Sequence, residues 1–244
     1  MNALINLKLK SAPSTEELLA SLLVDHDEPV SVSFVNPYSY QILAQRPDLL
    51  NALDHLYCDG VSGAKLLSWR LKCKIERVSF DMTSLAPIFF RFSEENNLRV
   101  YLLGANQKEV EGSRDSFLKT FPKLNVVGAR NGYFSNESEM TKACEDIFSK
   151  SADVVIVGMG TPKQEEFIKY IKSYSNTGLK GIFTCGGFIH QSSLKAEYYP
   201  YWINKLELRW LYRLLFEPHS RKRVFKYYPK FLINLLFSKD SSWQ

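Results

Sequence analysis

The sequence lacks the segments by which proteins enter or cross a membrane. None of its 244 residues lies in an apolar run of about eighteen, which excludes a membrane-spanning helix. The first ten residues have neither the continuous apolar core nor the small-residue cleavage site of a signal peptide. We therefore expect a cytoplasmic protein.

Cysteine is also scarce, and its spacing does not suit metal or disulfide chemistry. The four cysteines, at positions 58, 73, 144 and 185, lie far apart and form no C-x-x-C pair. We expect free buried thiols rather than a zinc site or disulfides. No cluster of His, Cys, Asp and Glu has metal-ligand spacing, and no G-x-S-x-G motif is present. The sequence therefore indicates no metal and no cofactor.

The charge of the chain is concentrated at one end. The net charge is only +5, but residues 201–244 carry nine Lys or Arg against three acidic residues, a net of +6. The same segment holds 11 of the 33 aromatic residues, and residues 1–200 have a net charge of −1. This asymmetry divides the chain into a nearly neutral body, 1–200, and a basic aromatic appendage, 201–244.

Apolar β-branched runs alternate with helical patterns along the body. Continuous apolar runs at 30–35, 100–103 and 154–157 are typical of strands buried on both faces, which occur in parallel sheets. Outside the helix at 14–23 we expect residues 1–30 to be irregular. Further strands are predicted at 56–58, 126–127 and 181–184, and further helices at 37–50, 61–69, 82–95, before 120, at 137–149 and at 162–174. The pattern predicts an α/β fold, a doubly wound Rossmann-like parallel sheet flanked by helices.

In such a sheet, ligands bind beyond the carboxyl ends of the strands. The residues that follow predicted strands are Asn36, Asp59, Gly104, the segment 158–164 and the segment 185–193. We expect these polar and glycine residues to converge on one edge of the sheet.

The segment Gly158-Met-Gly-Thr-Pro-Lys-Gln-Glu165 follows the run that is most typical of a strand and begins a helix. Two glycines permit a tight turn, and the free N–H groups of a first helical turn favour an anion such as a diphosphate. Lys163 stands where a dinucleotide-binding fingerprint needs its third glycine, and the spacing does not fit a Walker loop. Phosphate binding and a plain strand-to-helix turn are both compatible with this segment.

Three further positions have more than one interpretation. Asp59 can accept a proton from a substrate hydroxyl, or it can cap the helix that begins at Val61. Arg77 and Asp81 can position a phosphate or fix a loop through a salt bridge. His190, after Gly186-Gly187, can act as a base or can be a surface residue of a loop.

The appendage has cations at helical spacing. Lys205, Arg209 and Arg213 form one stripe beside Trp202, Trp210 and leucines, and Lys222, Lys226 and Lys230 form a second stripe beside Phe225, Tyr228 and Phe231. Such a surface suits an anionic membrane. Nucleic acid is disfavoured because the body is neutral and has no nucleic-acid motif. A helical hairpin packed on the core is the alternative.

Together these segments resemble the WecG/TagA/CpsF glycosyltransferases, family twenty-six, from about Val32 to Leu236. The resemblance rests on Asn36-Pro37, Asp59-Gly60, Arg77 with Asp81, Tyr101-Leu-Leu-Gly104, Val127-Gly128, Gly132-Tyr-Phe134, the Gly158 to Glu165 block, and Trp210-Leu-Tyr-Arg-Leu-Leu215 before Glu217-Pro218.

This resemblance implies a Rossmann-like fold of the GT-E type and an inverting, metal-independent hexosyl- or N-acetylhexosaminyltransferase. The donor would be a nucleotide sugar, usually UDP-linked, and the acceptor a polyprenyl-diphosphate-linked saccharide. The appendage would meet the inner face of the bacterial cell membrane. The resemblance places the general base on Asp59, an active-site arginine on Arg77 and a pocket glutamine on Gln164. Donor binding would further involve Asn36, Gly104, Gly158, Gly160, Lys163 and Gln191, and the acceptor diphosphate would face Arg213, Arg221 and Arg223.

The sequence departs from the family pattern near the second glycine turn. An aspartate usual in the family is absent from Phe188-Ile-His-Gln191, so that His190, Gln191 or Ser192 would make its donor contacts. An appendage arginine is shifted by one residue to Arg221, and Ser79-Phe80 replaces a glycine after Arg77. The alternative classes are a non-catalytic nucleotide-binding module and, less well supported, a nicotinamide-dependent oxidoreductase. Neither the sugar nor the oligomeric state follows from the sequence.

Overall fold

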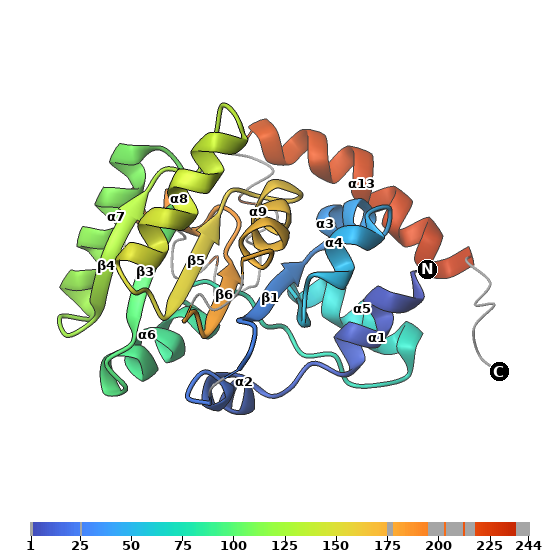
Figure 1. The fold of residues 1–244 in the computed structure, drawn as a ribbon. Helices are drawn as coiled ribbons and strands as arrows, with labels where there is room; N and C mark the ends of the chain where they lie inside the picture. The colour runs from blue at the N-terminus through green and yellow to red at the C-terminus, as the bar shows by residue number, and fades with distance from the viewer. Residues whose placement is uncertain are drawn as a thin grey trace.

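The computed structural model describes residues 2–24, 26–174, 178–194, 203, 212 and 218–237, and these residues fold around a six-stranded parallel sheet. The strand order is β2-β1-β6-β5-β3-β4, with β4 and β2 at the two edges (Figure 1). The predicted α/β class is therefore confirmed. The strands are β1 (Val30–Val35), β2 (His55–Cys58), β3 (Arg99–Gly104), β4 (Asn125–Arg130), β5 (Val154–Gly158) and β6 (Gly181–Thr184).

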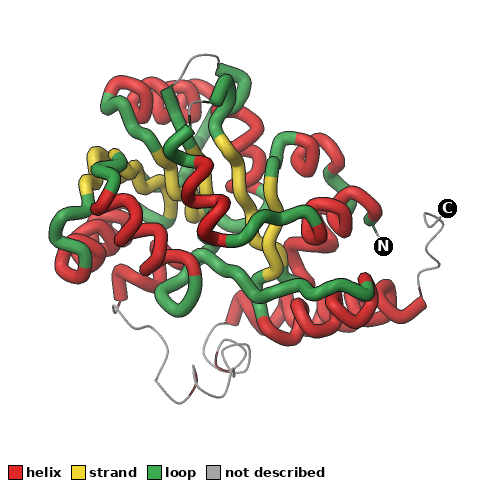
Figure 2. The backbone as a smooth tube through the Cα atoms, turned by 90° about the horizontal axis from the view of Figure 1, so that it is seen from below, coloured by secondary structure: helices red, strands yellow, loops and turns green. Residues whose placement is uncertain are grey.

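Helices cover both faces of the sheet, so that the strands lie inside a three-layer arrangement (Figure 2). One face is covered by α1 (Ala3–Lys10), α3 (Pro37–Leu43), α4 (Pro47–Asn51), α5 (Val61–Leu71), α8 (Glu137–Ser149), α9 (Lys163–Ile171) and α13 (Pro218–Phe237). The other face is covered by α2 (Thr15–Ser21), α6 (Leu85–Glu95), α7 (Gln107–Thr120) and α10 (Phe188–Leu194).

The central strands feed two separate cores because successive side chains point to opposite faces. Val155 and Val157 of β5 join the core on the α9 side, and Val154 and Ile156 join the core on the α7 side. All five residues of β5 are buried. This double burial is the physical reason for the continuous apolar runs in the sequence.

The structure corrects three predictions of secondary structure. Residues 1–30 are not irregular, because α1 begins at the cap of Asn2 and buries Ile5 and Leu9, four residues apart. The predicted helix at 37–50 is two helices, since Pro47 has no N–H to continue α3 and begins α4 instead. His190 lies in helix α10 and not in a loop.

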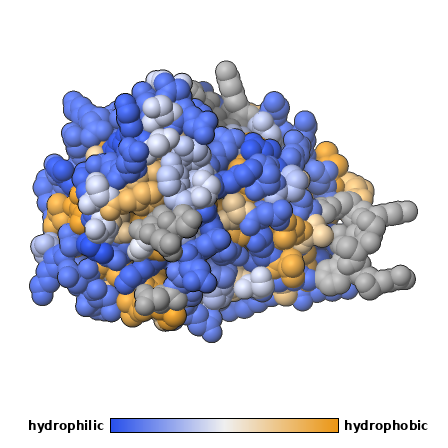
Figure 3. All heavy atoms as spheres, viewed as in Figure 1, coloured by the Kyte–Doolittle hydropathy of each residue, from blue (hydrophilic) through white to orange (hydrophobic). Residues whose placement is uncertain are grey.

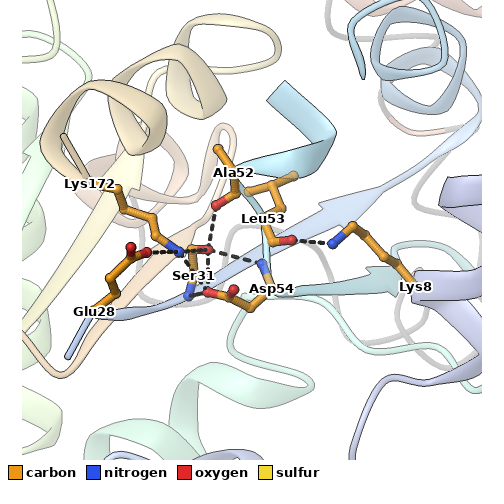
Figure 4. Close-up of polar contacts among 7 residues, drawn as sticks. All are labelled: Lys8, Glu28, Ser31, Ala52, Leu53, Asp54 and Lys172. Atoms are coloured by element: carbon orange, nitrogen blue, oxygen red, sulfur yellow. Dashed lines mark hydrogen bonds and ion pairs between the residues drawn. The ribbon is translucent and has the colours of Figure 1, made fainter. Parts of the chain in front are cut away.

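A network of polar side chains closes the amino-terminal edge of the sheet (Figure 4). The Asp54 carboxylate accepts hydrogen bonds from the backbone N–H of Ser31 at 2.8 Å and from its hydroxyl at 2.7 Å. Lys172, at the end of α9, lies 3.0 Å from the same carboxylate. Lys8 of α1 donates to the carbonyl oxygen of Leu53. The network ties α1, β1, β2 and α9 together at the edge opposite the expected site.

Helix α13 lies along the outside of the sheet and packs on α3 (Figures 1 and 2). The Tyr38 and Tyr227 rings meet edge to face with centroids 4.9 Å apart, and Tyr40 and Phe231 meet at 5.3 Å. Arg70 of α5 donates to the Leu235 carbonyl oxygen at 3.0 Å. The part of the appendage that the structure describes is therefore a helix held against the body by aromatic contacts.

Candidate functional site

Asp59 and Arg77 both lie next to Cys58, at the carboxyl end of the edge strand β2. Asp59 follows Cys58, the last residue of β2, and its backbone N–H donates to the Val35 carbonyl oxygen of β1 at 2.8 Å. The segment of Arg77 runs parallel to this strand end, since Val78 N–H donates to the Cys58 carbonyl oxygen at 3.0 Å. Both charged residues therefore lie next to Cys58 at this strand end.

The electrostatics around Cys58 agree with this placement. The pKa of the Cys58 thiol is raised to about 12, mainly by burial and also by the negative charge of Asp59, while the positive charge of Arg77 opposes the rise. The two charges thus both act on one buried sulfur atom. The buried thiol is therefore held in its neutral form.

The alternative role of Asp59 as a helix cap is not what the structure shows. Helix α5 begins after Gly60, so Gly60 and not Asp59 occupies the N-cap position. Gly60 has a φ of 105°, a conformation that favours glycine and turns the chain sharply from β2 into α5. Asp59 is half-buried beside this turn.

Arg77 is held by a polar loop. Its guanidinium Nη2 lies 2.5 Å from Asp81 Oδ2 and also donates to the Ser79 hydroxyl. Asp81 Oδ1 in turn accepts from the Thr83 backbone N–H at 2.8 Å and from its hydroxyl at 2.6 Å. Of the two roles considered for Arg77 and Asp81, the salt bridge that fixes the loop is present. The Arg77 side chain keeps 20% of its surface exposed, so a ligand can still reach it.

Asn36 follows β1 and forms the N-cap of α3. Its side-chain oxygen Oδ1 accepts from the backbone N–H groups of Tyr38 and Ser39 at 3.0 and 3.1 Å. This use of Oδ1 is structural, and only the amide nitrogen is left for a ligand. Beside Asn36, Cys58 and Phe231 of α13 line one shallow spot with no room for a water molecule, so α13 packs closely there. Through Phe231, α13 therefore reaches the ends of β1 and β2 at Asn36 and Cys58.

The glycine residues beyond the central strands pack backbone against backbone. A side chain at Gly104 would lie 2.4 Å from the Gly158 carbonyl oxygen, so no larger residue fits between β3 and β5. Gly160 has a φ of 75°, which lets the turn after β5 reverse into α9. Among the predicted donor-binding glycines, Gly104 and Gly158 thus serve close strand packing, and Gly160 serves the turn.

Gln164 connects the two glycine turns that follow β5 and β6. Its side-chain oxygen Oε1 accepts from the Gly160 N–H and from the Gly186 N–H, each at 3.1 Å. Its Nε2 donates to Glu165 Oε1 at 2.9 Å. Only 3% of Gln164 is exposed, so its amide serves the protein's own turns. Lys163, directly before it, is exposed at the start of α9.

The residues that stand near the position of the family's aspartate differ in how exposed they are. Gln191 and Ser192 are buried in α10, whereas His190 is exposed. The His190 ring nitrogen Nδ1 lies 2.8 Å from Glu109 Oε1, near the start of the neighbouring helix α7. The Asn106 N–H donates to Glu109 Oε2 at 3.0 Å. The imidazole is therefore fixed at the carboxyl edge of the sheet, between the ends of β3 and β6.

Two predicted acceptor residues lie outside what the structure describes. Arg213 is not among the described residues, and neither is the side chain of Arg223, so their predicted roles stay predictions. Arg221 is described and exposed in the first half of α13. Within the described ranges no three His, Cys, Asp or Glu side chains are grouped so that they could hold a metal ion.

Comparison with known proteins places the chain in a family of transferases. Residues 3–243 match the family described as "Glycosyl transferase WecG/TagA/CpsF family". The chain belongs to this family. The predicted resemblance is thereby confirmed over nearly the whole chain, and with it the assignment to the glycosyltransferases.

Two relatives show the range of named activities. The chain is 38% identical over 205 residues, 84% of its length and 85% of the relative's, to a Shigella boydii protein named UDP-Gal:alpha-D-GlcNAc-diphosphoundecaprenol beta-1,4-galactosyltransferase. It is 24% identical over 220 residues, 87% of its length and 81% of the relative's, to a Bacillus subtilis N-acetylglucosaminyldiphosphoundecaprenol N-acetyl-beta-D-mannosaminyltransferase. Both relatives carry names of enzymes that act on undecaprenol-diphosphate-linked sugars.

Several features of the site could not be found from sequence. The bridging role of Gln164 depends on Gly186, 22 residues further along the chain. Glu109, the partner of His190, lies 81 residues away in sequence, and no local pattern connects the two residues. The Asn-x-x-Glu spacing of Asn106 and Glu109 is a capping-box signal, which marks the start of α7 but not the contact with His190.

Proposed function

We propose that the protein transfers a sugar from a nucleotide donor, UDP-linked as in the Shigella relative, to a polyprenyl-diphosphate-linked saccharide, with inversion at the anomeric carbon. The observation that carries this proposal is that a half-buried carboxylate, Asp59, and an arginine held by Asp81, Arg77, both lie next to Cys58 at the carboxyl end of β2. In a glycosyltransferase such a pair supplies a base for the acceptor and a cation for the leaving group.

Asp59 and Arg77 have separate roles in this reaction. Asp59 takes the proton from the acceptor hydroxyl while that oxygen bonds to the anomeric carbon and the bond to the nucleotide diphosphate breaks. Negative charge then grows on the departing diphosphate. Arg77, which is preorganised by Asp81, stabilises that charge together with the first turn of α9, whose exposed Lys163 adds a further cation.

The acceptor side is assigned to α13. Its outward face combines apolar side chains with cations, and Phe225, Leu232 and Leu236 are 73, 40 and 56% exposed. Arg221, Lys226 and Lys230 lie exposed beside this apolar stripe. Figure 3 shows apolar atoms gathered over the part of the surface where the second half of α13 lies.

A cationic helix with an apolar face suits an anionic lipid surface. We assign α13 to the membrane that carries the acceptor, while Phe231 on its inner face packs beside Asn36 and Cys58. No helix in the described part of the chain has both the length and the apolar character needed to span a bilayer.

The test begins with the donor and then adds the acceptor. A panel of UDP- and GDP-sugars is screened for ligands that raise the melting temperature, because a ligand that binds only the folded state stabilises it. The sugars that bind are then incubated with N-acetylglucosaminyl-diphosphoundecaprenol in vesicles, and the anomeric configuration of the product is determined by NMR. The proposal expects transfer with inversion. Binding of a nucleotide without transfer to any lipid-linked acceptor would instead favour a non-catalytic nucleotide-binding module.

A further inference from the structure

Glu165 is an acidic residue that the proposed chemistry does not use, although it lies directly beneath the glycine turns. It is fully buried in α9. The hydrogen bonds recorded for its side chain come from neutral groups, the side chains of Ser33, Thr161 and Gln164. Burial raises the pKa of the Glu165 carboxyl group, while these hydrogen bonds partly oppose the rise.

Another buried acid in the same sheet is satisfied differently. Asp153, next to the amino end of β5, accepts from the Arg99 backbone N–H at 2.8 Å and from the Arg99 guanidinium at 3.0 Å. Lys180 lies 3.9 Å away on the other side. Asp153 is thus a buried acid paired with a partly exposed arginine, whereas Glu165 bears the cost of burial with no cationic partner among the described residues.

One oxygen atom of Glu165 does all the hydrogen bonding. Oε1 accepts from Ser33 Oγ at 2.8 Å, from Gln164 Nε2 at 2.9 Å and from Thr161 Oγ1 at 3.1 Å. Oε2 is buried and has no hydrogen-bond partner among the described residues. Burial of a carboxyl group that forms its hydrogen bonds through Oε1 alone is costly, which indicates that the position of Oε1 matters to the residues around it.

That acceptor fixes the orientation of the Gln164 amide. Because Nε2 of Gln164 donates to Glu165, its Oε1 points the other way and accepts from Gly160 and Gly186. The network also reaches the sheet, since the Thr184 hydroxyl of β6 donates to Ser33 Oγ of β1 at 3.0 Å. One carboxyl group therefore sets the spacing of the two turns relative to the strands β1, β5 and β6.

We propose that Glu165 is a positioning residue for the nucleotide donor: through Gln164 it holds the glycine turns after β5 and β6 at the separation that donor binding requires. This inference rests on the proposed donor site. It assigns to Glu165 and Gln164 a role in shaping the site from within, without contact to the ligand.

The experiment compares three variants of the full chain by calorimetric titration with UDP. Glu165→Met keeps the volume and removes the acceptor, and we expect it to weaken UDP binding about tenfold, the scale of a lost buried hydrogen bond. Glu165→Gln keeps an acceptor oxygen at the position of Oε1, and its affinity should stay within about threefold of the original. Asp153→Ala is the matched control, since it breaks a buried acid's contacts at the opposite edge and should leave UDP affinity unchanged.

A double variant tests the route of the effect. If Glu165 acts through Gln164, Glu165→Met combined with Gln164→Leu binds UDP no more weakly than Gln164→Leu alone. Additive losses would overturn the proposed route. If Glu165→Met and Asp153→Ala both lower the melting temperature and neither changes UDP affinity, Glu165 is purely structural and the inference is overturned. Absence of UDP binding by the unaltered chain would contradict the donor site itself, a separate result.

Discussion

The guanidinium of Arg77 lies 2.5 Å from the carboxylate of Asp81, four residues further along a loop that runs beside the end of β2. Both side chains are about one-fifth exposed, at 20 and 22%. This ion pair orients the cation assigned to the leaving diphosphate while it partly neutralises that cation. Such a compromise is expected where a charge must be held in place for catalysis.

The first prediction concerns Asp81. Asp81→Ala removes the partner that orients Arg77, and we expect the rate of sugar transfer to fall about tenfold, because a misplaced catalytic group loses part of its advantage. The measurement is the initial transfer rate at saturating donor. Glu76→Ala, which breaks the exposed Lys74–Glu76 pair in the same loop, is the control and should leave the rate unchanged. An equal loss in both variants would show a general effect of the loop.

The second prediction concerns Asp59. Asp59→Asn is nearly isosteric but cannot accept the acceptor's proton, so transfer should slow at least about a hundredfold, the scale of a lost general base. UDP affinity, measured by calorimetry, should be nearly unchanged. Asp54→Asn, at the opposite edge of the sheet, serves as the control and should transfer at the original rate. Near-normal turnover of Asp59→Asn would remove Asp59 from the mechanism.

Local sequence patterns predicted the secondary structure correctly where the residue types in them have one strong structural consequence. The continuous valine and isoleucine run of β5 predicted a strand buried on both faces, and Asp59-Gly60 predicted a turn at a strand end. The sequence pattern did not predict helix α1, which packs at the β2 edge through two buried apolar residues, Ile5 and Leu9. Helix α10 was not predicted either, because Gly186 and Gly187 favoured a loop there.

Contacts between distant residues could not be predicted from the sequence. Ser33 and Glu165 are 132 residues apart, and no local sequence pattern near either residue predicts their hydrogen bond. The pairing of His190 with Glu109 likewise depends on how closely α7 and α10 pack. Periodicity predicts which face of an element is buried, but a polar contact is set by the register between two elements, which a single sequence does not contain.

The third prediction concerns His190. Among the three residues considered as replacements for the family aspartate, His190 is exposed at the edge and Gln191 and Ser192 are buried. His190→Ala should therefore raise the KM for the donor several-fold with little change in kcat, since one orienting contact is worth about 1 kcal/mol. Steady-state kinetics with a varied donor concentration provide the measurement. Ser193→Ala, on the same helix, is the control, and an unchanged KM in His190→Ala would exclude donor contact by this residue.

The fourth prediction is a pH dependence that originates in Asp54. Burial favours its neutral form, but hydrogen bonds from Ser31 and the charge of Lys172 outweigh this, and the pKa of Asp54 falls below its usual value of 3.8. A depressed folded-state pKa means that the ionised carboxylate stabilises the folded state above about pH 4, and that this contribution is lost as the pH falls through the lowered pKa.

Asp54→Asn should accordingly unfold more easily than the original chain at pH 7, by about 1 kcal/mol because the side chain is 42% exposed and partly screened. The difference should shrink as the pH is lowered below 4. Urea denaturation at a series of pH values measures it. A difference that is independent of pH would show that the charge of Asp54 contributes nothing and that only its hydrogen-bond geometry matters.

The fifth prediction concerns the outer face of α13. Phe225→Ser combined with Leu236→Ser removes two side chains that are 73 and 56% exposed, so the fold should be little affected. We expect the double variant to lose most of its binding to vesicles that contain anionic lipid, because burial of apolar area and attraction of cations act together at such a surface. Flotation of the protein with vesicles provides the measurement.

Variants of the α13 cations, measured at different salt concentrations, separate the electrostatic contribution to vesicle binding from the apolar one. Lys226→Ala with Lys230→Ala should reduce binding by about 1 kcal/mol for each cation and should weaken its dependence on salt, since the lost attraction is Coulombic. Ile88→Ser, at an exposed apolar residue of α6 on the other face of the sheet, is the control and should float as the original chain does. If the α13 variants also float unchanged, the membrane surface lies elsewhere on the molecule, and the placement of the acceptor beside α13 is wrong.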